Sequence, residues 1–247
     1  MSDLGDEYLL GIDIGTYESK GVLTRVDGQV VCMCAKPHDL ISTQPGWFEH
    51  DAEGTWWNDF CYLAKRLIDE AGIAPNSIAA VGCSTIGPCV LPLDRQEQPL
   101  RKAILYGIDT RSAEEIESLK GTIGQDEVFK RTGNDLSSQA AGPKILWIKN
   151  HEPQVYNQTS LFVSGTTFLV GKLTGNWLMD HYTASTYVPL YDFSRQGWSD
   201  DLCQRVVSPE KLPEIAWTSQ VAGTVTSTAA EESGLSEGTP VIVGTVD

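Results

Sequence analysis

Three stretches near the N-terminus carry the apolar, β-branched pattern that is typical of strands. They run from Tyr8 to Gly15 (YLLGIDIG), from Ser19 to Val26 (SKGVLTRV) and from Gln29 to His38 (QVVCMCAKPH). Only a few residues separate one stretch from the next, and Asp27-Gly28 is a turn dipeptide. The pattern therefore predicts three successive antiparallel strands.

Beyond Asp51 the period of the apolar positions changes to that of a helix. Apolar residues at positions 56, 60, 63, 64, 67, 68 and 71 share one face, and Gly72 and Pro75 end the pattern. The next run, Ser77 to Ser84 (SIAAVGCS), is mostly apolar. Such a run after a crossover helix is typical of a buried strand that lies parallel to its neighbour.

This order of elements predicts the fold class. Three antiparallel strands followed by a helix and a parallel strand resemble the ribonuclease-H-like core of actin-like ATPases and sugar kinases. We therefore expect an α/β domain with a mixed sheet, three antiparallel strands first, flanked by helices. Further helices are predicted at positions 112–120, 143–150 and 166–173, and Gly175 ends the last one.

Both ends of the chain place a carboxylate at the tip of a predicted strand. Asp13 lies in the first strand, and the final apolar run, Val241 to Val243, leads through Gly244 to Asp247. The carboxyl ends of strands are where α/β folds bind ligands. We therefore interpret Asp13 and Asp247 as candidate site residues.

The composition excludes several classes of protein. With 247 residues, of which 41% are hydrophobic, the chain can bury a core, either as one large domain or as two subdomains in close contact. Its formal charge of -15 repels phosphate backbones, so nucleic acid is not expected as a partner. No apolar run approaches the roughly 20 residues of a membrane span and the N-terminus is acidic, which predicts a cytoplasmic protein with no membrane partner.

The cysteines and histidines do not point to a metal or catalytic site of their own. Six scattered cysteines without a CxxC pair predict reduced, packed thiols. The four histidines lack neighbours typical of a catalytic triad, and we assign no catalytic role to His38, His50, His151 or His181.

The segment around Asp13 (GIDIGTYESKG) suits a phosphate group. A carboxylate on an apolar strand costs several kcal/mol unless it is paired or binds a metal. Gly15 lets the backbone approach a phosphate, Thr16 adds a hydroxyl, and the amides of the turn can form an anion-binding nest. The alternative is that Asp13 or Thr16 simply closes a hairpin turn, and the local residues favour neither interpretation.

Six segments, in order and spacing, resemble the N-terminal domain of the FGGY carbohydrate kinases, nearest to xylulokinase-like members. They are YLLGIDIGTYESKGVL, PGWFEHDAEGTWW, AILYGIDTR, GPKILWIKNHEP, FLVGKLTG and the C-terminal run from LPEIAW to Asp247. The resemblance implies that residues 1–247 form the sugar-binding domain of an ATP-dependent kinase of the pentulose or polyol class. It also implies that the nucleotide-binding C-terminal domain is absent from this chain.

The resemblance also implies roles for individual residues, with ATP and Mg²⁺ as cofactors. Asp247 matches the catalytic base, and Asp13 matches the carboxylate that binds Mg²⁺ directly or through water. Gly15 and Thr16 match the hairpin that approaches the phosphates, and we group Lys20 with them. Phosphoryl transfer requires this combination of in-line positioning, charge neutralisation and a carboxylate for the attacking hydroxyl.

The expected sugar-side residues come from two loops. They are Thr85 and Ile86 after the strand that begins at Ser77, and Tyr106, Asp109 and Arg111 in LYGIDTR. An aromatic face can stack on a sugar and a carboxylate can accept from its hydroxyls. The alternatives are structural: Asp109 caps the following helix, Arg111 forms an ion pair, and Gly87-Pro88 is a simple turn.

Two segments depart from the family pattern. Gly244-Thr245-Val246-Asp247 stands where Gly-Gly-Gly-Asp is common, and Ser84 to Pro88 lacks the Gln and His of the xylulokinase loop Gln-Met-His-Gly. The second departure argues against xylulose as the substrate. The alternative function is a stand-alone, non-catalytic sugar-binding or regulatory module, and the exposed cleft predicts a homodimer of the isolated, inactive chain.

Overall fold

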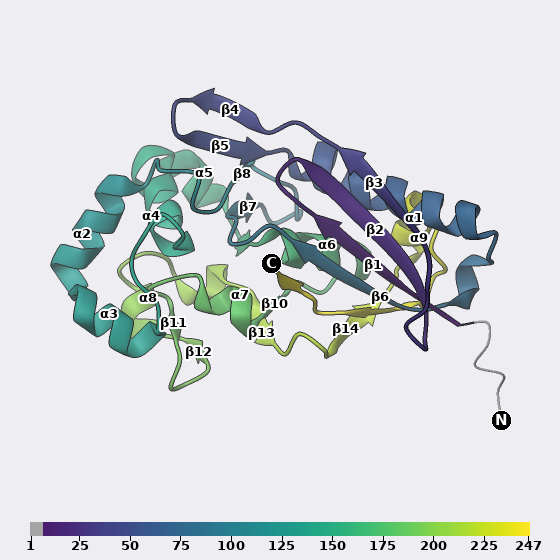
Figure 1. Ribbon diagram of the computed structural model, residues 1–247. Coiled ribbons are helices and arrows are strands. Elements are labelled where there is room, and N and C mark those ends of the chain that lie inside the picture. The colour runs from purple at the N-terminus through teal and green to yellow at the C-terminus, as the bar shows by residue number, and fades with distance from the viewer. Residues whose placement is uncertain (1–6) are drawn as a thin grey trace.

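The computed structural model describes residues 7–247 (Figure 1). Its centre is a seven-stranded sheet with the strand order β14-β15-β6-β1-β2-β3, in which the short β16 also pairs with β6. The strands are β1 (Tyr8–Ile14), β2 (Glu18–Arg25), β3 (Val30–Pro37), β6 (Ile78–Thr85), β14 (Val221–Thr224), β15 (Pro240–Ile242) and β16 (Thr245–Val246).

The first three strands are antiparallel neighbours, as the sequence predicts. In the register, Asp13 lies opposite Lys20, and Lys20 lies opposite Ala35. β6 pairs in parallel with β1 on one side and with β15 and β16 on the other. The predicted fold class, a mixed α/β sheet that begins with three antiparallel strands, is confirmed.

Helices cover one face of the central sheet. The π-helix η2 (Ala52–Trp57) leads into α1 (Asn58–Ala71), which contacts β1, β2 and β3. On the same face α6 (Gly165–Thr174) contacts β6, β14 and β15, and α9 (Ser227–Ser233) contacts both α1 and α6. The helices therefore form one layer, which packs on one face of the sheet.

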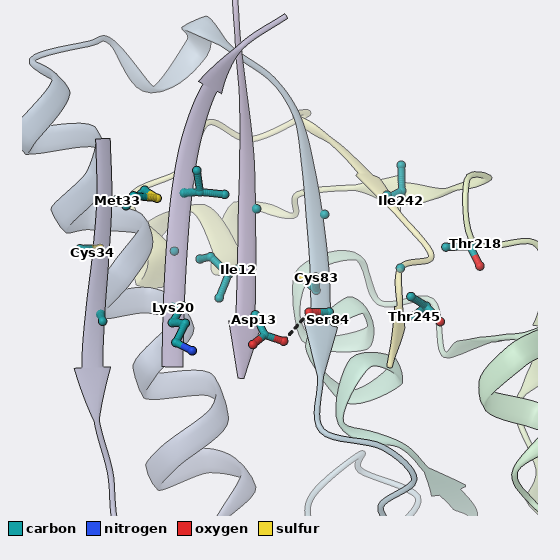
Figure 2. A pocket seen from close by; sticks show the side chains of 16 residues that line it. Ile12, Asp13, Lys20, Met33, Cys34, Cys83, Ser84, Thr218, Ile242 and Thr245 are labelled. Atoms are coloured by element: carbon teal, nitrogen blue, oxygen red, sulfur yellow. Dashed lines mark hydrogen bonds between the residues drawn. The ribbon is translucent and has the colours of Figure 1, made fainter. Parts of the chain in front are cut away.

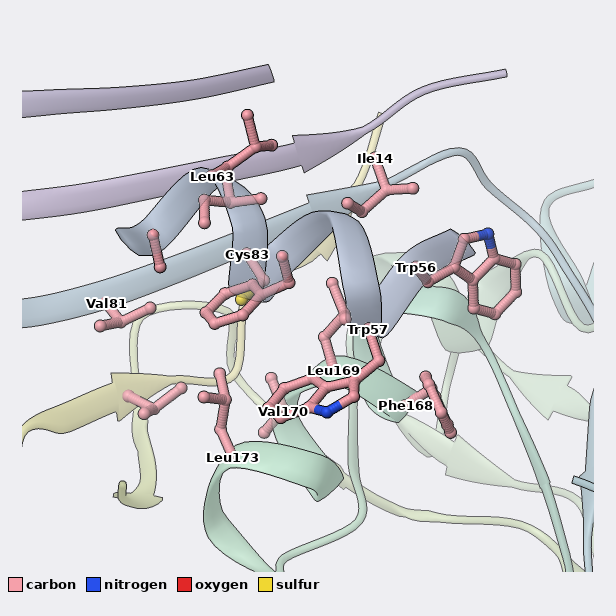
Figure 3. Packing of buried hydrophobic residues seen from close by; sticks show 14 of the residues in the cluster. Ile14, Trp56, Trp57, Leu63, Val81, Cys83, Phe168, Leu169, Val170 and Leu173 are labelled. Atoms are coloured by element: carbon pink, nitrogen blue, oxygen red, sulfur yellow. The ribbon is translucent and has the colours of Figure 1, made fainter. Parts of the chain in front are cut away.

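The larger hydrophobic core lies between this helical layer and the sheet (Figure 3). Trp56, Leu63 and Phe168 are fully buried in it. The helix ends follow the sequence, because Gly72 (φ 62°) and Gly175 (φ 75°) end α1 and α6 in the left-handed conformation that favours glycine. The predicted stop signals of both helices are therefore confirmed.

The opposite face of the sheet carries no helix among residues 7–247 (Figure 1). An open, mostly apolar pocket of about 710 Å³ runs along it, and Met33, which is 68% exposed, and Ile242 lie on its walls. The alternate residues of β3, Cys32 and Cys34, face α1 instead. Sheets with parallel strands are normally covered on both faces. Because no helix of residues 7–247 lies on this one, we call it the uncovered face.

The remaining residues form a second, helical part beyond the carboxyl ends of β1 and β6, with its own core. Its helices are α2 (Ala113–Ile123), α3 (Gln125–Thr132), α4 (Ala141–His151), α5 (Pro153–Gln158), α7 (His181–Ser185) and α8 (Asp200–Cys203). Figure 1 shows the C-terminus at the junction of this part and the central sheet. No helix of the described residues is long and apolar enough to cross a membrane.

The remaining elements are short. They are β4 (Ile41–Gln44), β5 (Trp47–His50), β7 (Leu91–Leu93), β8 (Ala103–Ile104), β9 (Leu161–Val163), β10 (Leu178–Asp180), β11 (Tyr191–Asp192), β12 (Gly197–Trp198), β13 (Glu214–Ala216), η3 (Pro75–Ser77) and η4 (Pro209–Lys211). The sequence pattern locates α2, α4 and α6 within a few residues. It does not predict β4 and β5 or the short α3 and α5, because these bury few residues and show no regular apolar period.

We expect Leu63→Ala to lower the free energy of unfolding by about 2–5 kcal/mol, the usual cost of a cavity in a packed core. Leu63 is fully buried on α1, and its Cβ would lie 3.4 Å from a Cβ added at Gly21 of β2. Urea denaturation measures the change. The exposed Asp69 on the same helix is the control, since Asp69→Ala should change stability by only about 0.5 kcal/mol.

Candidate functional site

Four polar side chains form a row across the ends of the central strands. In the strand registers Lys20 lies opposite Asp13, Asp13 lies beside Ser84, and Ser84 lies beside Thr245. Figure 2 shows this row at one end of the pocket on the uncovered face, with Ser84 Oγ donating to Asp13 Oδ1. Neighbouring strands lie about 4.8 Å apart, so the row is roughly 15 Å long.

The turn between β1 and β2 lies at the same edge. The Gly15 amide donates to Glu18 O over 3.0 Å, and a Cβ at Gly15 would lie only 2.7 Å from that oxygen, so the turn requires glycine. Thr16 Oγ1 lies 3.2 Å from the Tyr106 hydroxyl. The exposed Lys20 ammonium lies 3.8 Å from Glu18. The structure thus brings together the four residues expected at the phosphates: Asp13, Gly15, Thr16 and Lys20.

Asp247 is held beside the end of β6. Its amide donates to Thr85 O over 3.1 Å, and its Oδ1 accepts from the Gly87 amide over 3.2 Å. Gly244 turns the chain from β15 into β16 with φ 70°, where a Cβ would lie 2.3 Å from Cys83 O. Glycine at this position is therefore required for Asp247 to reach the tip of β6.

A second pocket, of about 370 Å³, opens beside Asp247. Besides Asp247, its polar lining residues are Asn134, Asp135, Ser137, Gln139, Tyr182 and Thr186. Amide, carboxylate and hydroxyl groups on a partly apolar wall are what sugar sites use to bind hydroxyls. The sequence analysis missed these residues because they lie in a polar loop and around a short helix, where no local pattern distinguishes a ligand contact from a solvated turn.

Thr85, Ile86 and Tyr106 do not line this pocket. Thr85 is fully buried with its hydroxyl 3.0 Å from that of Thr166, and Ile86 belongs to the hydrophobic core. Direct substrate contact, expected for all three, is therefore not the role that the geometry favours. Thr85 and Ile86 are instead buried next to the end of β6, and Tyr106 contacts the β1–β2 turn.

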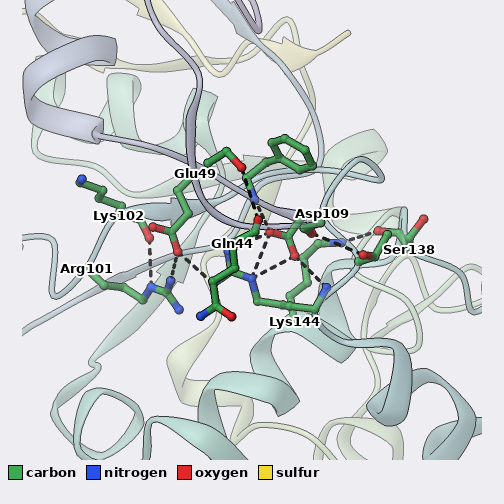
Figure 4. Close-up of polar contacts among 12 residues, drawn as sticks. Gln44, Glu49, Arg101, Lys102, Asp109, Ser138 and Lys144 are labelled. Atoms are coloured by element: carbon green, nitrogen blue, oxygen red, sulfur yellow. Dashed lines mark hydrogen bonds and ion pairs between the residues drawn. The ribbon is translucent and has the colours of Figure 1, made fainter.

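Asp109 and Arg111 belong to a buried ion-pair network that includes Glu49. Figure 4 shows Asp109 and Glu49 among these polar contacts. Arg111 Nε lies 3.0 Å from both Asp109 oxygens, Nη1 lies 2.9 Å from Glu49, and the guanidinium lies over the Trp47 ring. Asp109 also accepts from the Phe48 amide over 2.7 Å. These contacts occupy both side chains and favour the structural alternative over sugar binding.

Lys144 supports the loop that lines the second pocket. The side chain is fully buried, and Nζ donates to the backbone oxygens of Ser138 and Ala140. Burial lowers the pKa of Lys144 to about 8. Its hydrogen bonds fix the backbone on both sides of Gln139, which is one of the lining residues.

The donor set at the strand ends suits a nucleotide-bound magnesium ion. Within residues 7–247 no group of three or more His, Cys, Asp and Glu side chains is placed to hold a metal. Mg²⁺ that binds with a nucleotide keeps several waters and uses phosphate oxygens, so one or two protein carboxylates suffice. The partly exposed Asp13 is such a carboxylate.

Residues 8–247 match the N-terminal domain of the FGGY family of carbohydrate kinases, and the chain belongs to this family. It is 32% identical to a glycerol kinase of Nocardia farcinica over 89% of the chain and 45% of the relative. It is 27% identical to a xylulose kinase of Bacillus subtilis over 98% of the chain and 48% of the relative.

The solved structures agree with the sequence relatives. A xylulose kinase from Rhodospirillum rubrum superposes with a TM-score of 0.92 at 28% identity, over 98% of this chain and 49% of that one. The chain therefore spans about half the length of the kinases it resembles. The resemblance that the sequence motifs indicate is confirmed.

We expect Asp109→Asn to lower the free energy of unfolding by about 3 kcal/mol, because it leaves the fully buried Arg111 short of a charge partner. Sugar affinity should fall little, since the side chain does not line the pocket. Urea denaturation and sugar-binding calorimetry separate the two effects. The exposed Asp39 gives the control variant Asp39→Asn; a lost sugar affinity with unchanged stability would instead identify Asp109 as a substrate contact.

Proposed function

We propose that this chain is the sugar-binding half of an ATP-dependent kinase that phosphorylates a hydroxyl of a pentulose or polyol. The observation that carries the proposal is the position of Asp247, on the wall of a polar pocket and two residues beyond the row that contains Asp13. A sugar in the pocket would present its hydroxyl to Asp247. The other carboxylate, Asp13, lies in the row at the strand ends, where the phosphates would bind.

In this proposal Asp247 orients the sugar hydroxyl and takes its proton as the oxygen attacks the γ-phosphate. The Gly87 amide holds one oxygen of the carboxylate, which fixes its direction. The β1–β2 turn and Lys20 would contact the phosphates, and Asp13 would hold Mg²⁺ directly or through water. When bound, the metal would neutralise phosphate charge.

The electrostatics support a site that depends on amides and a metal. The chain carries a formal charge of -15, which would repel a free nucleotide. Lys20, which belongs to the row of polar side chains at the strand ends, is exposed to solvent. Backbone amides and Mg²⁺ can bind a polyanion without a cluster of basic side chains.

The pocket supports a small polyhydroxylated substrate. Its volume of about 370 Å³ is near the lower end for ligand sites. Asn134, Asp135, Gln139 and Tyr182 supply donors and acceptors, and Pro88 and Val188 are among the apolar lining residues.

The uncovered face supports a second domain in the complete enzyme. The relatives continue for about as many residues again, and the apolar pocket of about 710 Å³ reaches from the row at Asp13 along the sheet. We assign this surface to the C-terminal half of the kinase, because a mixed sheet with parallel strands is normally covered on both faces.

We expect Asp247→Asn in the full-length kinase to lower kcat about 10²- to 10⁴-fold, the range for loss of a general base, with little change in the KM for sugar. Asp135→Asn should instead raise the sugar KM, because it removes an acceptor from the pocket wall. ADP release against ketoses and polyols measures both. Full activity of Asp247→Asn would exclude the role, and a wild-type protein that binds sugar without releasing ADP would favour the non-catalytic module.

We expect the isolated chain to associate through the uncovered face. Met33→Asp should weaken self-association and hydrophobic dye binding at least about threefold, because it places a charge on the apolar surface. Phe129, which is 55% exposed on α3, provides the control Phe129→Asp. Sedimentation measures the effect, and equal association of both variants would argue against this face.

A further inference from the structure

Two imidazole rings support the β1–β2 turn from inside the domain. His38 Nε2 lies 3.1 Å from Gly15 O, and His50 Nε2 lies 3.1 Å from Thr16 O. The next carbonyl, Tyr17 O, accepts from the backbone amide of His38 over 2.9 Å. Two residues therefore fix three successive carbonyls of the turn.

The direction of these carbonyls sets the direction of the amides. In a trans peptide the C=O of one residue and the N–H of the next point opposite ways, and none of the bonds in this turn is cis. Because the oxygens of Gly15 and Thr16 face the histidines, the N–H groups of Thr16 and Tyr17 point away from them. By holding the carbonyl oxygens, the histidines thus set the direction in which the N–H groups of the turn point.

The proton position on His50 follows from its partners. Its Nδ1 lies 3.0 Å from Trp56 Nε1, and an indole N–H can only donate. The proton of the neutral ring is therefore on Nε2, where it is donated to Thr16 O. Burial, together with the nearby His38, lowers the pKa of His50 to about 4, so the ring stays neutral at pH 7.

His38 lies between two acceptors. Its Nδ1 lies 2.9 Å from Asp59 Oδ2, and its Nε2 faces Gly15 O. The Ser19 hydroxyl lies 3.2 Å from the same Nδ1, so both nitrogens of the ring have polar partners. Burial raises the pKa of Asp59, but hydrogen bonds from His38, Lys36 and Ser19 outweigh it and lower the pKa, which keeps the carboxylate ionised.

We infer that His38 and His50 are positioning residues for phosphoryl transfer. They orient the β1–β2 turn so that its outward amides meet the nucleotide phosphates, and Asp59 holds the His38 ring in place through its contact with Nδ1. The kinetic consequence rests on the proposed kinase function, whereas the proton positions are a property of this chain alone.

Nitrogen-15 NMR of the histidine rings in the chain 1–247 tests the proton positions. At pH 7 we expect His50 to carry its proton on Nε2, and we expect the Nδ1 signal of His38 to shift in Asp59→Asn, because that change removes the carboxylate beside it. His151, half-exposed on α4, is the internal control and should not respond. A proton on Nδ1 of His50, or a His38 ring that is unchanged in Asp59→Asn, would overturn the assignment.

Kinetics of the full-length kinase test the positioning role. Asp59→Asn and His50→Leu should each raise the KM for ATP about tenfold, equivalent to about 1.4 kcal/mol, and leave the sugar KM within about twofold. His50→Gln keeps an N–H donor and should recover most of the loss, and His151→Asn is the control.

The outcomes separate the proposed kinase function from the proposed positioning role of His38 and His50. A wild-type enzyme that releases no ADP with any sugar would contradict the proposed function, while the NMR experiment still decides the proton positions. An active wild-type enzyme whose ATP KM is unchanged in both Asp59→Asn and His50→Leu would show that the positioning role is wrong.

Discussion

The site depends on the parallel pairing of β6 with a neighbour on each side. This pairing aligns the carboxyl ends of β1, β6 and β16, so that Asp13 and Asp247, from opposite ends of the chain, meet at one edge of the sheet. The glycine conformation at Gly244 and the hydrogen bond to Thr85 O complete the arrangement. If this pairing shifted by one residue, alternate side chains would exchange faces and the polar row would be lost.

Buried charges around the site have structural tasks. Asp109, Arg111 and Glu49 join the segment before α2 to β5, and Asp59 joins α1 to β2 and to the residues that follow β3. Each is hydrogen-bonded on several sides, which offsets the cost of removing the charge from water. The carboxylates proposed for chemistry, Asp13 and Asp247, are by contrast the more accessible ones.

The sequence was informative where a pattern is local and periodic. It predicted the three antiparallel strands, α1 and the strand β6. It did not find the lining of the pocket beside Asp247, because Asn134, Asp135 and Tyr182 come together through tertiary packing and carry no periodic signal. It proposed Asp109 as a substrate contact, since one sequence cannot distinguish a buried ion pair from a ligand contact. It gave His38 and His50 no catalytic role, because their partners, which are Asp59, Trp56 and two carbonyls of the β1–β2 turn, come together only in the folded chain.

The way in which Asp247 is held couples two distant parts of the sequence. Its amide donates to Thr85 O, and its carboxylate accepts from the Gly87 amide, which lies 160 positions earlier in the chain. The direction of this carboxylate is therefore set by the end of β6 as well as by the strand that carries it. A substitution that displaces the tip of β6 would move the carboxylate with it, although no side chain beside Asp247 had changed.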